Sequence, residues 1–173
     1  QSFGTESYTF SIMEDITVPV VDNIASFSNI DVYEGTYVTS EFTYNTFDPN
    51  QRYILSNSNI DVSTINVMWK PSQLSSVKRR YRRSDSLFEV TSESPVYWVH
   101  EIEDERYELI FGDGIFGRAL QEPNFLEVAY LVNNGSNANG VSDLSFNGKL
   151  TTSRDNVAIN TGISRITVNT PSF

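Results

Sequence analysis

The chain contains no cysteine, which excludes a disulfide framework and a metal site built from thiolates. A single histidine, His100, nearly excludes nitrogen-rich metal sites and the catalytic triads that use histidine as their base. Basic residues are few, 12 against 22 acidic ones, so the formal net charge is −10. That balance argues against a general nucleic-acid binder, whose affinity comes mainly from accumulated Lys and Arg. No apolar run approaches the roughly 20 residues that cross a membrane.

Residues that favour helices are also scarce. Val, Ile and Thr together number 43, whereas Ala and Leu number 14, and 22 residues are aromatic. Branched and aromatic side chains pack well on pleated surfaces. The composition therefore predicts a mainly β fold, either an antiparallel β-sandwich or two small β lobes, with long loops and little helix.

Several short segments alternate apolar and polar residues or are rich in branched side chains, as strands do. These segments are 8–12, 37–44, 51–55, 64–69, 124–132 and 164–169. Asn147 and Gly148 form the dipeptide preferred in two-residue hairpin turns, which predicts a hairpin around them. We expect one β-rich assembly domain over residues 1–173, excerpted from a longer protein because the chain begins with Gln1 and not Met. If the domain forms two lobes, we expect the division near 71–86.

The segment "SPVYWVHEIEDERYELIF", residues 94–111, predicts a β-hairpin whose solvated turn is "EDER". One face of its first strand consists of Val96, Trp98, His100 and Ile102. On that apolar face we interpret His100 as a satisfied structural histidine. Nearby carboxylates suggest the paired acids of a glycosidase, but they are so close in sequence that a solvated hairpin tip explains them better. These carboxylates are Glu101, Glu103, Asp104, Glu105 and Glu108.

The segment "KRRYRR", residues 78–83, carries five of the 12 basic residues and shows no apolar periodicity. Nucleic acid, a phosphate-rich polymer or an acidic protein could bind it, and an exposed loop with at most one helical turn is the plain interpretation. Segregated charge steers the encounter of two proteins and sets their orientation. Our hypothesis is that this loop docks on an acidic surface of a neighbouring subunit, including the carboxylates of another copy. The candidate docking residues are Lys78, Arg79, Arg80, Arg82 and Arg83.

The segment "YELIFGDGIFGRAL", residues 107–120, places three glycines within six residues. A phosphate loop needs Lys and Ser or Thr after its glycines and then a helix, but Arg118 and Ala119 follow here. "GDGIFG" matches the dinucleotide-binding spacing without the βαβ context that this fingerprint requires. A calcium loop needs several carboxylates, and only Asp113 is present.

We therefore interpret this segment as a structural turn, because Asp-Gly between apolar flanks makes a tight turn. We expect Phe111 and Phe116 to be buried beneath it, and Arg118 to cap loop carbonyls or a carboxylate. The residues of this turn motif are Phe111, Gly112, Asp113, Gly114, Gly117 and Arg118.

Together with the following "NFLEVAYLVNNGSNANGV", this stretch resembles the baseplate J-like family of contractile phage tails. The shared features are an apolar strand, Phe-Gly-Asp-Gly at 111–114, a second glycine at Gly117, a strand at 127–132 and a Gly/Asn-rich turn at 133–140. The upstream "EGTYVTSEFTYN" and "QRYILSNSNIDVSTINVMW" resemble larger members of the family, the baseplate wedge proteins of T4-like phages. The resemblance covers roughly residues 30–150. A proline-rich step common in the family is reduced here to "ALQEP".

The resemblance implies a non-enzymatic, structural component of the baseplate wedge, assembled into the ring around the tail tube. It implies a location in the virion after assembly in the host bacterial cytoplasm. Its expected partners are other wedge proteins and a second copy of itself, with no cofactor, metal, nucleic acid, membrane or small-molecule substrate. One alternative stays open, a carbohydrate-binding or adhesin-like β-sandwich whose exposed Tyr and Trp stack on sugar faces.

Overall fold

The computed structural model describes residues 7–48, 50–121, 125–138, 144–155, 157–159 and 166–167. Two compact units make up the chain. Gly35–Asn133 forms one, which we call the inserted unit, and Gln1–Glu34 together with Asn134–Phe173 forms the other, the flanking unit. Segment 71–86, the division that the sequence suggested, lies inside the inserted unit.

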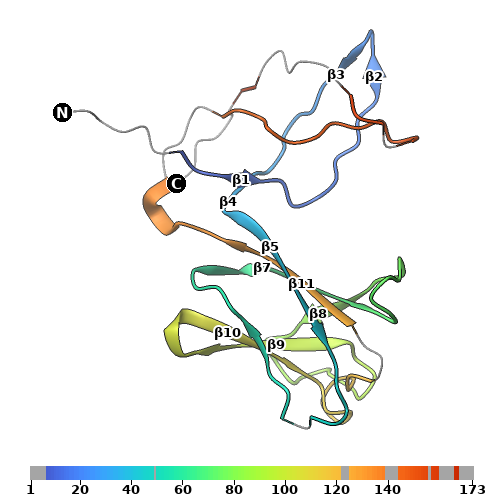
Figure 1. Ribbon diagram of the computed structural model, residues 1–173, viewed down its shortest axis with the longest axis vertical. Helices are drawn as coiled ribbons and strands as arrows, with labels where there is room; N and C mark the ends of the chain where they lie inside the picture. Colours follow the sequence, from blue (N-terminus) through green and yellow to red (C-terminus); the bar gives the residue numbers. More distant parts are fainter. Residues whose placement is uncertain are drawn as a thin grey trace, which may run out of the picture. The chain divides into compact units, whose positions relative to one another are not determined.

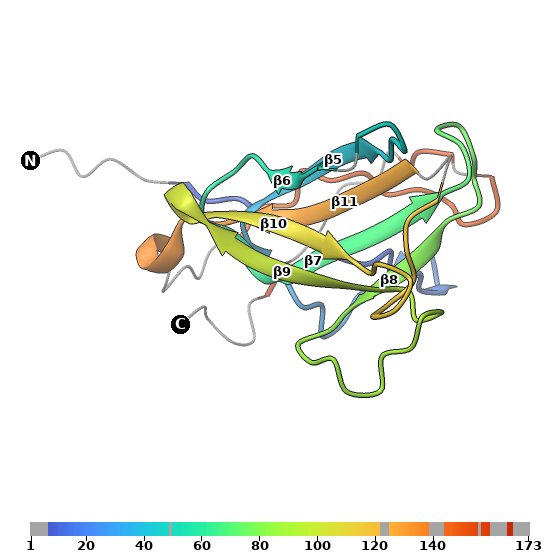
Figure 2. The same cartoon turned by 90° about the horizontal axis from the view of Figure 1, so that it is seen from below.

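One sheet of seven strands builds the inserted unit, with the spatial order β5-β11-β7-β8-β9-β10-β6. The strands are β5 (Thr36–Thr43), β6 (Tyr53–Leu55), β7 (Ile60–Lys70), β8 (Arg79–Arg83), β9 (Val96–Ile102), β10 (Arg106–Phe111) and β11 (Phe125–Val132). Figure 2 shows β11 lying beside β5, and β10 lying beside β9. The described residues contain no α-helix, so the predicted mainly β fold is confirmed.

Strands form within most of the segments expected from the sequence, namely 37–44, 51–55, 64–69, the described part of 124–132 and the hairpin within 94–111. The turn of this hairpin lies within the predicted "EDER" and is a single 3-10 turn, η1 (Glu103–Glu105). One pairing is parallel: β8 lies beside β9, with Arg82 opposite Val96 and Arg83 opposite Tyr97. Parallel neighbours need a long crossover connection, and residues 84–95 provide it.

The seven-stranded sheet curls until it is nearly closed. Its two edge strands meet through side chains: the rings of Phe42 on β5 and Tyr53 on β6 stack edge to face, with centroids 5.6 Å apart. The buried Tyr130 hydroxyl donates to Asn57 Oδ1 at 2.8 Å and lies 3.2 Å from Ser40 Oγ. Side chains rather than backbone bonds therefore connect the two edges.

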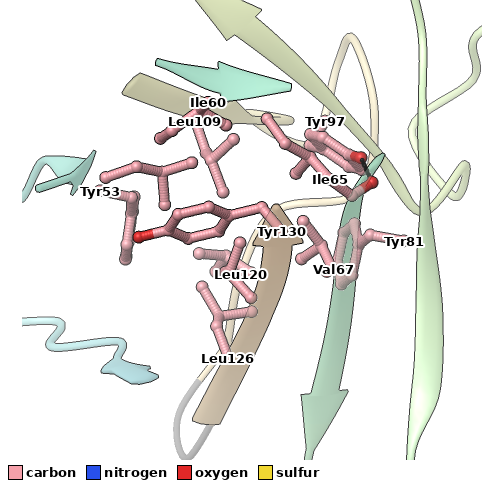
Figure 3. Packing of buried hydrophobic residues seen from close by; sticks show 12 residues of the cluster. Tyr53, Ile60, Ile65, Val67, Tyr81, Tyr97, Leu109, Leu120, Leu126 and Tyr130 are labelled. Atoms are coloured by element: carbon pink, nitrogen blue, oxygen red, sulfur yellow. Dashed lines mark hydrogen bonds between the residues drawn. The ribbon is translucent and has the colours of Figure 1, made fainter. Parts of the chain in front are cut away.

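The core of the inserted unit is formed by side chains that its strands direct inward. Figure 3 shows these side chains around the ring of Tyr130. Its buried members are Tyr53, Leu55, Ile60, Ile65, Val67, Tyr81, Tyr97, Leu109, Leu120, Leu126, Val128 and Tyr130. The Tyr97 hydroxyl donates to the Ile65 carbonyl at 2.9 Å (Figure 3), beside an irregularity in the β7–β11 register. Buried tyrosines need such a partner for their polar end.

The flanking unit has much shorter strands among its described residues. β1 (Phe10–Ser11) pairs with β4 (Tyr33–Glu34), β2 (Val20–Val21) pairs with β3 (Ile24–Ala25), and η2 (Gly135–Ala138) is a 3-10 turn. Of the strand expected at 8–12, only the two residues of β1 form. The strand expected at 164–169 lies mostly outside the described residues.

The hairpin predicted around Asn147 and Gly148 is wrong for the described residues 144–155, which contain no named strand. The Phe146 ring explains the difference, because a Cβ added to Gly148 would lie 2.6 Å from its Cζ. The dipeptide is used for close packing of that ring rather than for a turn between paired strands. A single bridge between Thr151 and Ala158 follows it.

Candidate functional site

Two of the glycines of the 111–118 turn are required by close backbone approach. A Cβ on Gly112 would lie 2.2 Å from the carbonyl carbon of Gly117, a distance that no real contact shows. Gly117 adopts φ +86°, and a Cβ there would lie 3.0 Å from Val96 Cγ2 and 3.3 Å from Trp98 Cη2. Gly114 also has a positive φ, +89°, and its N–H donates to Gly117 O at 3.0 Å. The turn is therefore closed on itself and lies directly on β9.

The carboxylate of Asp113 is held inside this turn. Its Oδ1 accepts from the backbone N–H groups of Phe116 and Ile115, each at 2.8 Å. These two hydrogen bonds, the one from Phe116 first, hold the pKa of Asp113 below its ordinary value. The charge therefore stabilises the turn, in the way that Asp side chains commonly fix local backbone.

The turn also holds the crossover that leads into β9. Gly117 N–H donates to Thr91 O at 3.2 Å, and Arg118 N–H donates to Ser94 O at 2.7 Å. Beneath it, Val96 is buried and Trp98 is half-buried. The glycine turn thus fastens residues 84–95 and covers the outer face of β9, while Tyr97 on the inner face enters the core.

The expectations for the flanking side chains of the turn hold only in part. Phe111 packs on the core, where its ring meets Tyr53 at 5.2 Å and Tyr81 at 5.3 Å, both edge to face. Phe116 is 50% exposed, so its expected burial is wrong. The reason is that Asp113 draws the Phe116 N–H inward and leaves the ring outside. Among the described residues no side-chain hydrogen bond is found for Arg118, although its charge opposes the rise that burial causes in the pKa of Tyr81.

The basic segment is a strand, so the exposed loop expected from the sequence is wrong. Arg79–Arg83 is β8, which joins β7 to β9 in the middle of the sheet. Two exposed arginines lie on each side of Tyr81, which is 2% exposed and belongs to the core. The sequence pattern missed this strand because a single inward residue, Tyr81, supplies all of its apolar periodicity.

Three of the five basic candidates are engaged within the chain. Lys78 Nζ lies 2.5 Å from Glu127 Oε1, and the Arg79 guanidinium lies over the ring of Trp69 at 5.5 Å. Arg83 Nε lies 3.1 Å from Asp85 Oδ1.

The other two basic candidates, Arg80 and Arg82, are both exposed on β8. Within the described ranges, the side chains of these two arginines make no ion pair or hydrogen bond. Residues two apart on a strand point to the same face, about 7 Å apart. Arg80 and Arg82 are therefore two cations on one face of a central strand, and neither has an ion-pair partner among the described residues.

His100 is exposed and not packed on an apolar face as expected. It lies opposite Glu108 across the β9–β10 ladder. The Glu108 carboxylate is bound by Arg52 at 2.6 Å and 2.8 Å, which lowers the pKa of Glu108. Its neighbours in the acidic turn, Glu103–Glu105, are exposed, as a solvated hairpin tip predicts. Glu108 is therefore paired with Arg52, whereas the carboxylates of the turn are exposed to solvent.

A charge cluster at one end of the sheet was missed by the sequence analysis. Lys70, 6% exposed, lies with its Nζ 3.1 Å from Glu127 Oε2 and 3.4 Å from Glu41 Oε1. Hydrogen bonding to Glu127 is the first cause of a raised pKa at Lys70, and hydrogen bonding to Lys78 is the first cause of a lowered pKa at Glu127. A buried lysine is stable only when paired in this way. No local pattern signals the cluster, because its members come from three strands and a loop.

The fold and site together define a mainly β unit whose glycine turn is committed to internal contacts. No family model matches the chain, and no curated protein matches it. In the part of the chain that is described, no cluster of three or more candidate ligands could hold a metal ion. Across the same ranges, no helix has the length and apolar character needed to cross a membrane.

Proposed function

We propose that the chain is a structural component of a contractile-tail baseplate wedge, which assembles with other proteins into the ring around the tail tube. The observation that carries the proposal is that contacts within the chain hold the 111–118 segment as a structural turn. The resemblance to the baseplate J-like family rests on this segment. Its glycines allow close backbone packing, and Asp113 fixes the turn from within. Because contacts within the chain hold this segment, it supports the role of a scaffold rather than that of a catalytic site.

The docking surface in this proposal is the outer face of β8, defined by Arg80 and Arg82. The chain as a whole is strongly acidic, with a net charge of −10, whereas this pair lies within the basic segment 78–83. Tyr81 between them is buried, which fixes the strand from which they project. An acidic surface on another wedge protein, or on another copy, is the chemistry that fits two neighbouring exposed guanidinium groups.

The test is a charge-removal variant, Arg80→Ser with Arg82→Ser, in a binding assay with the wedge proteins encoded beside the gene. We expect association at low salt to slow by about tenfold, with a smaller difference at high salt, because exposed charges steer encounter. Sedimentation or stopped-flow fluorescence with purified partners measures this.

A matched control is Lys149→Ser with Arg154→Ser, which removes the same charge from exposed residues of the flanking unit. If the control slows association as much as the β8 variant, net charge and not the β8 face is responsible. If wild-type chain binds none of the wedge proteins, the proposed function itself fails.

The carbohydrate-binding alternative depends on exposed tyrosine or tryptophan faces. Trp69 is covered by Arg79, and Trp98 lies beneath Gly117, so neither indole is a free platform for a sugar ring. Tyr33 and Tyr37 are 44% and 50% exposed, so the alternative rests on these tyrosines, and the assembly role remains the proposal.

A further inference from the structure

Four loops of the inserted unit gather at one end of its sheet. β5, β7 and β10 run toward this end, and β6, β8, β9 and β11 run away from it, because every neighbouring pair is antiparallel except β8 with β9. The turn between β9 and β10 lies at the opposite end of these strands (Figure 1). We call the four segments 44–52, 71–78, 84–95 and 112–121 the loop end.

The loop end carries most of the large apolar side chains that the inserted unit exposes. Phe47, Leu74 and Phe88 are 91%, 97% and 89% exposed, and Ile115 is 70% exposed. In the rest of the described part of this unit, only two other large apolar side chains are exposed. Single exposed apolar residues are ordinary, but a group of them with charged neighbours marks an interaction site.

Hydrogen bonds within each loop hold these apolar residues in place. The backbone N–H groups of Phe47, Phe88 and Ile115 each donate to a side-chain oxygen of the same loop, at 3.0, 3.0 and 2.8 Å. The acceptors are, in that order, Asn45, Ser86 and Asp113. Beside Leu74, the N–H of Ser75 donates to Ser72 O at 3.1 Å. Loops that are already ordered lose little conformational freedom on binding, which lowers the cost of covering them.

The exposed charges that remain unpaired on these loops are carboxylates. Among the described residues, four exposed carboxylates of the loop end make no ion pair, namely Asp48, Glu89, Glu93 and Asp113. The cations of the same loops are not available in this way: Arg52 binds Glu108, Lys78 binds Glu127, and Arg118 is half-buried. The loop end is therefore apolar at its tips and acidic beside them.

We infer that the loop end docks on another protein, at a surface whose apolar pockets are rimmed by Lys or Arg side chains. Apolar anchors fill pockets, and carboxylates complement the cations around them. The four most exposed anchors present roughly 600 Å² of side chain, a large share of the roughly 800 Å² that each partner gives to a standard interface. An anionic membrane fits less well, because its surface repels carboxylates.

This inference deepens the proposed assembly role, on which it rests for the identity of the partner, and it does not use the arginines of β8. The two surfaces have opposite chemistry. The β8 surface is basic and acts on association, whereas the loop end is apolar and acts mainly on dissociation, as most interface contacts do.

The first test uses a probe that is independent of the wedge proteins. A synthetic amphipathic helix of Leu and Lys has an apolar face with lysines on both sides, and the same helix with Glu in place of Lys is its control. Fluorescence anisotropy of the labelled Leu/Lys helix should show binding to the full chain. The triple variant Phe47→Ser, Leu74→Ser, Phe88→Ser should bind it at least tenfold more weakly. Equal binding by both proteins, or equal binding of the Leu/Glu helix, overturns the inference.

A matched control removes three apolar side chains of similar exposure from the flanking unit. Val20, Val21 and Ile24 are 66%, 62% and 65% exposed, and their replacement by Ser should leave binding at the wild-type level. Equal loss in this control would make exposed apolar surface in general responsible and overturn the inference.

A second variant keeps every apolar anchor, so it does not depend on how the serine substitutions affect folding. Asp48→Lys with Glu89→Lys should also weaken binding of the Leu/Lys helix by at least tenfold at low salt, because both carboxylates lie next to an anchor. Unchanged binding contradicts the inferred basic rim.

The last test uses the purified wedge proteins. The triple variant should dissociate from them at least tenfold faster than the wild type. Dissociation at the wild-type rate overturns the inference and leaves the proposed function standing. If the Leu/Lys helix binds as expected but the wild-type chain binds no wedge protein, the proposed function fails and the docking surface remains.

Two further measurements decide between occupants. One is cosedimentation with vesicles of phosphatidylcholine, alone or mixed with phosphatidylglycerol, and the other is sedimentation equilibrium of the chain alone. We expect neither vesicle binding nor self-association through the loop end. Either one, if the triple variant abolishes it, makes lipid or a second copy the occupant and overturns the inference.

Discussion

The two units of the chain use similar residue types to very different effect. All twelve buried residues of the core cluster come from the inserted unit. In the described residues of the flanking unit only Ala138 is buried, and Val20, Val21 and Ile24 are each more than 60% exposed. Both units contain branched and aromatic residues, so composition alone does not make a core.

Strand length accounts for the difference. β7 has 11 residues and β11 has eight, so each buries several residues of one row against its neighbours. β2 and β3 have two residues each, which gives one inward position apiece. Isolated two-stranded ribbons are marginal in water for this reason. We therefore expect the stability of the inserted unit to depend on its own core, and substitutions in the flanking strands to have little effect.

The largest effect should come from Leu109→Ala. Leu109 is 1% exposed within the core cluster, so the substitution removes buried methyl groups and leaves a cavity. The free energy of unfolding of the inserted unit should fall by about 3 kcal/mol. Urea unfolding followed by tryptophan fluorescence reports on this unit alone, because both tryptophans, Trp69 and Trp98, lie in it. Ile110→Ala, at a neighbour that is 44% exposed, should cost much less, and equal costs would contradict the core assignment.

Gly112→Ala should come next, at about 2 kcal/mol. The added methyl would meet the backbone of Gly117 at 2.2 Å, and backbone cannot move as a side chain can. The same fluorescence-detected unfolding measures the loss. Gly135→Ala is the matched substitution in the flanking unit, where the φ is +62° but the space is open. It should leave the tryptophan transition unchanged, and a shift as large as that of Gly112→Ala would show that chain-wide strain, not local contact, is responsible.

The sequence predicts the long strands of the inserted unit well, because each carries an apolar row of its own. It fails at β8, where the basic residues around Tyr81 hide one inward side chain, and the strand forms because β7 and β9 lie on both sides. It also misses Lys70, whose partners Glu41 and Glu127 lie far away in the chain. The glycine turn was expected as a turn, but its attachment to Thr91 and to Ser94 depends on tertiary contact.

A smaller effect is expected at the charge cluster, about 1 kcal/mol for Glu127→Gln at neutral pH. Lys78 and Lys70 hold the pKa of Glu127 below its ordinary value of 4.5, so the folded state binds its proton less readily than the unfolded state. The stabilisation is therefore complete above pH 4.5 and is lost as the pH falls through the lowered pKa.

Unfolding midpoints of wild type and Glu127→Gln should accordingly converge in acid. Lys70 limits the stabilisation at alkaline pH. Its pKa is raised above 10.5, so its contribution to stability is present below pH 10.5 and is lost as the pH rises through the raised pKa. Glu41, which also faces Lys70, is unchanged in this variant and keeps part of the pairing. If the difference in unfolding midpoint between the two proteins stays constant from acid to neutral pH, the ion pairs of the cluster do not contribute to stability.

The smallest effect should come from Val21→Ser in the flanking unit, below about 0.5 kcal/mol. Val21 is 62% exposed, and among the described residues its strand partner is the two-residue β3, so little apolar surface returns to water when the side chain is replaced. Circular dichroism is the suitable measurement, because the tryptophans do not report on this unit. A loss comparable with that of Leu109→Ala would mean that the flanking strands are buried in solution by something that covers them. The contrast between a unit with its own core and a unit of short ribbons would then be a property of the isolated chain and not of the assembled protein.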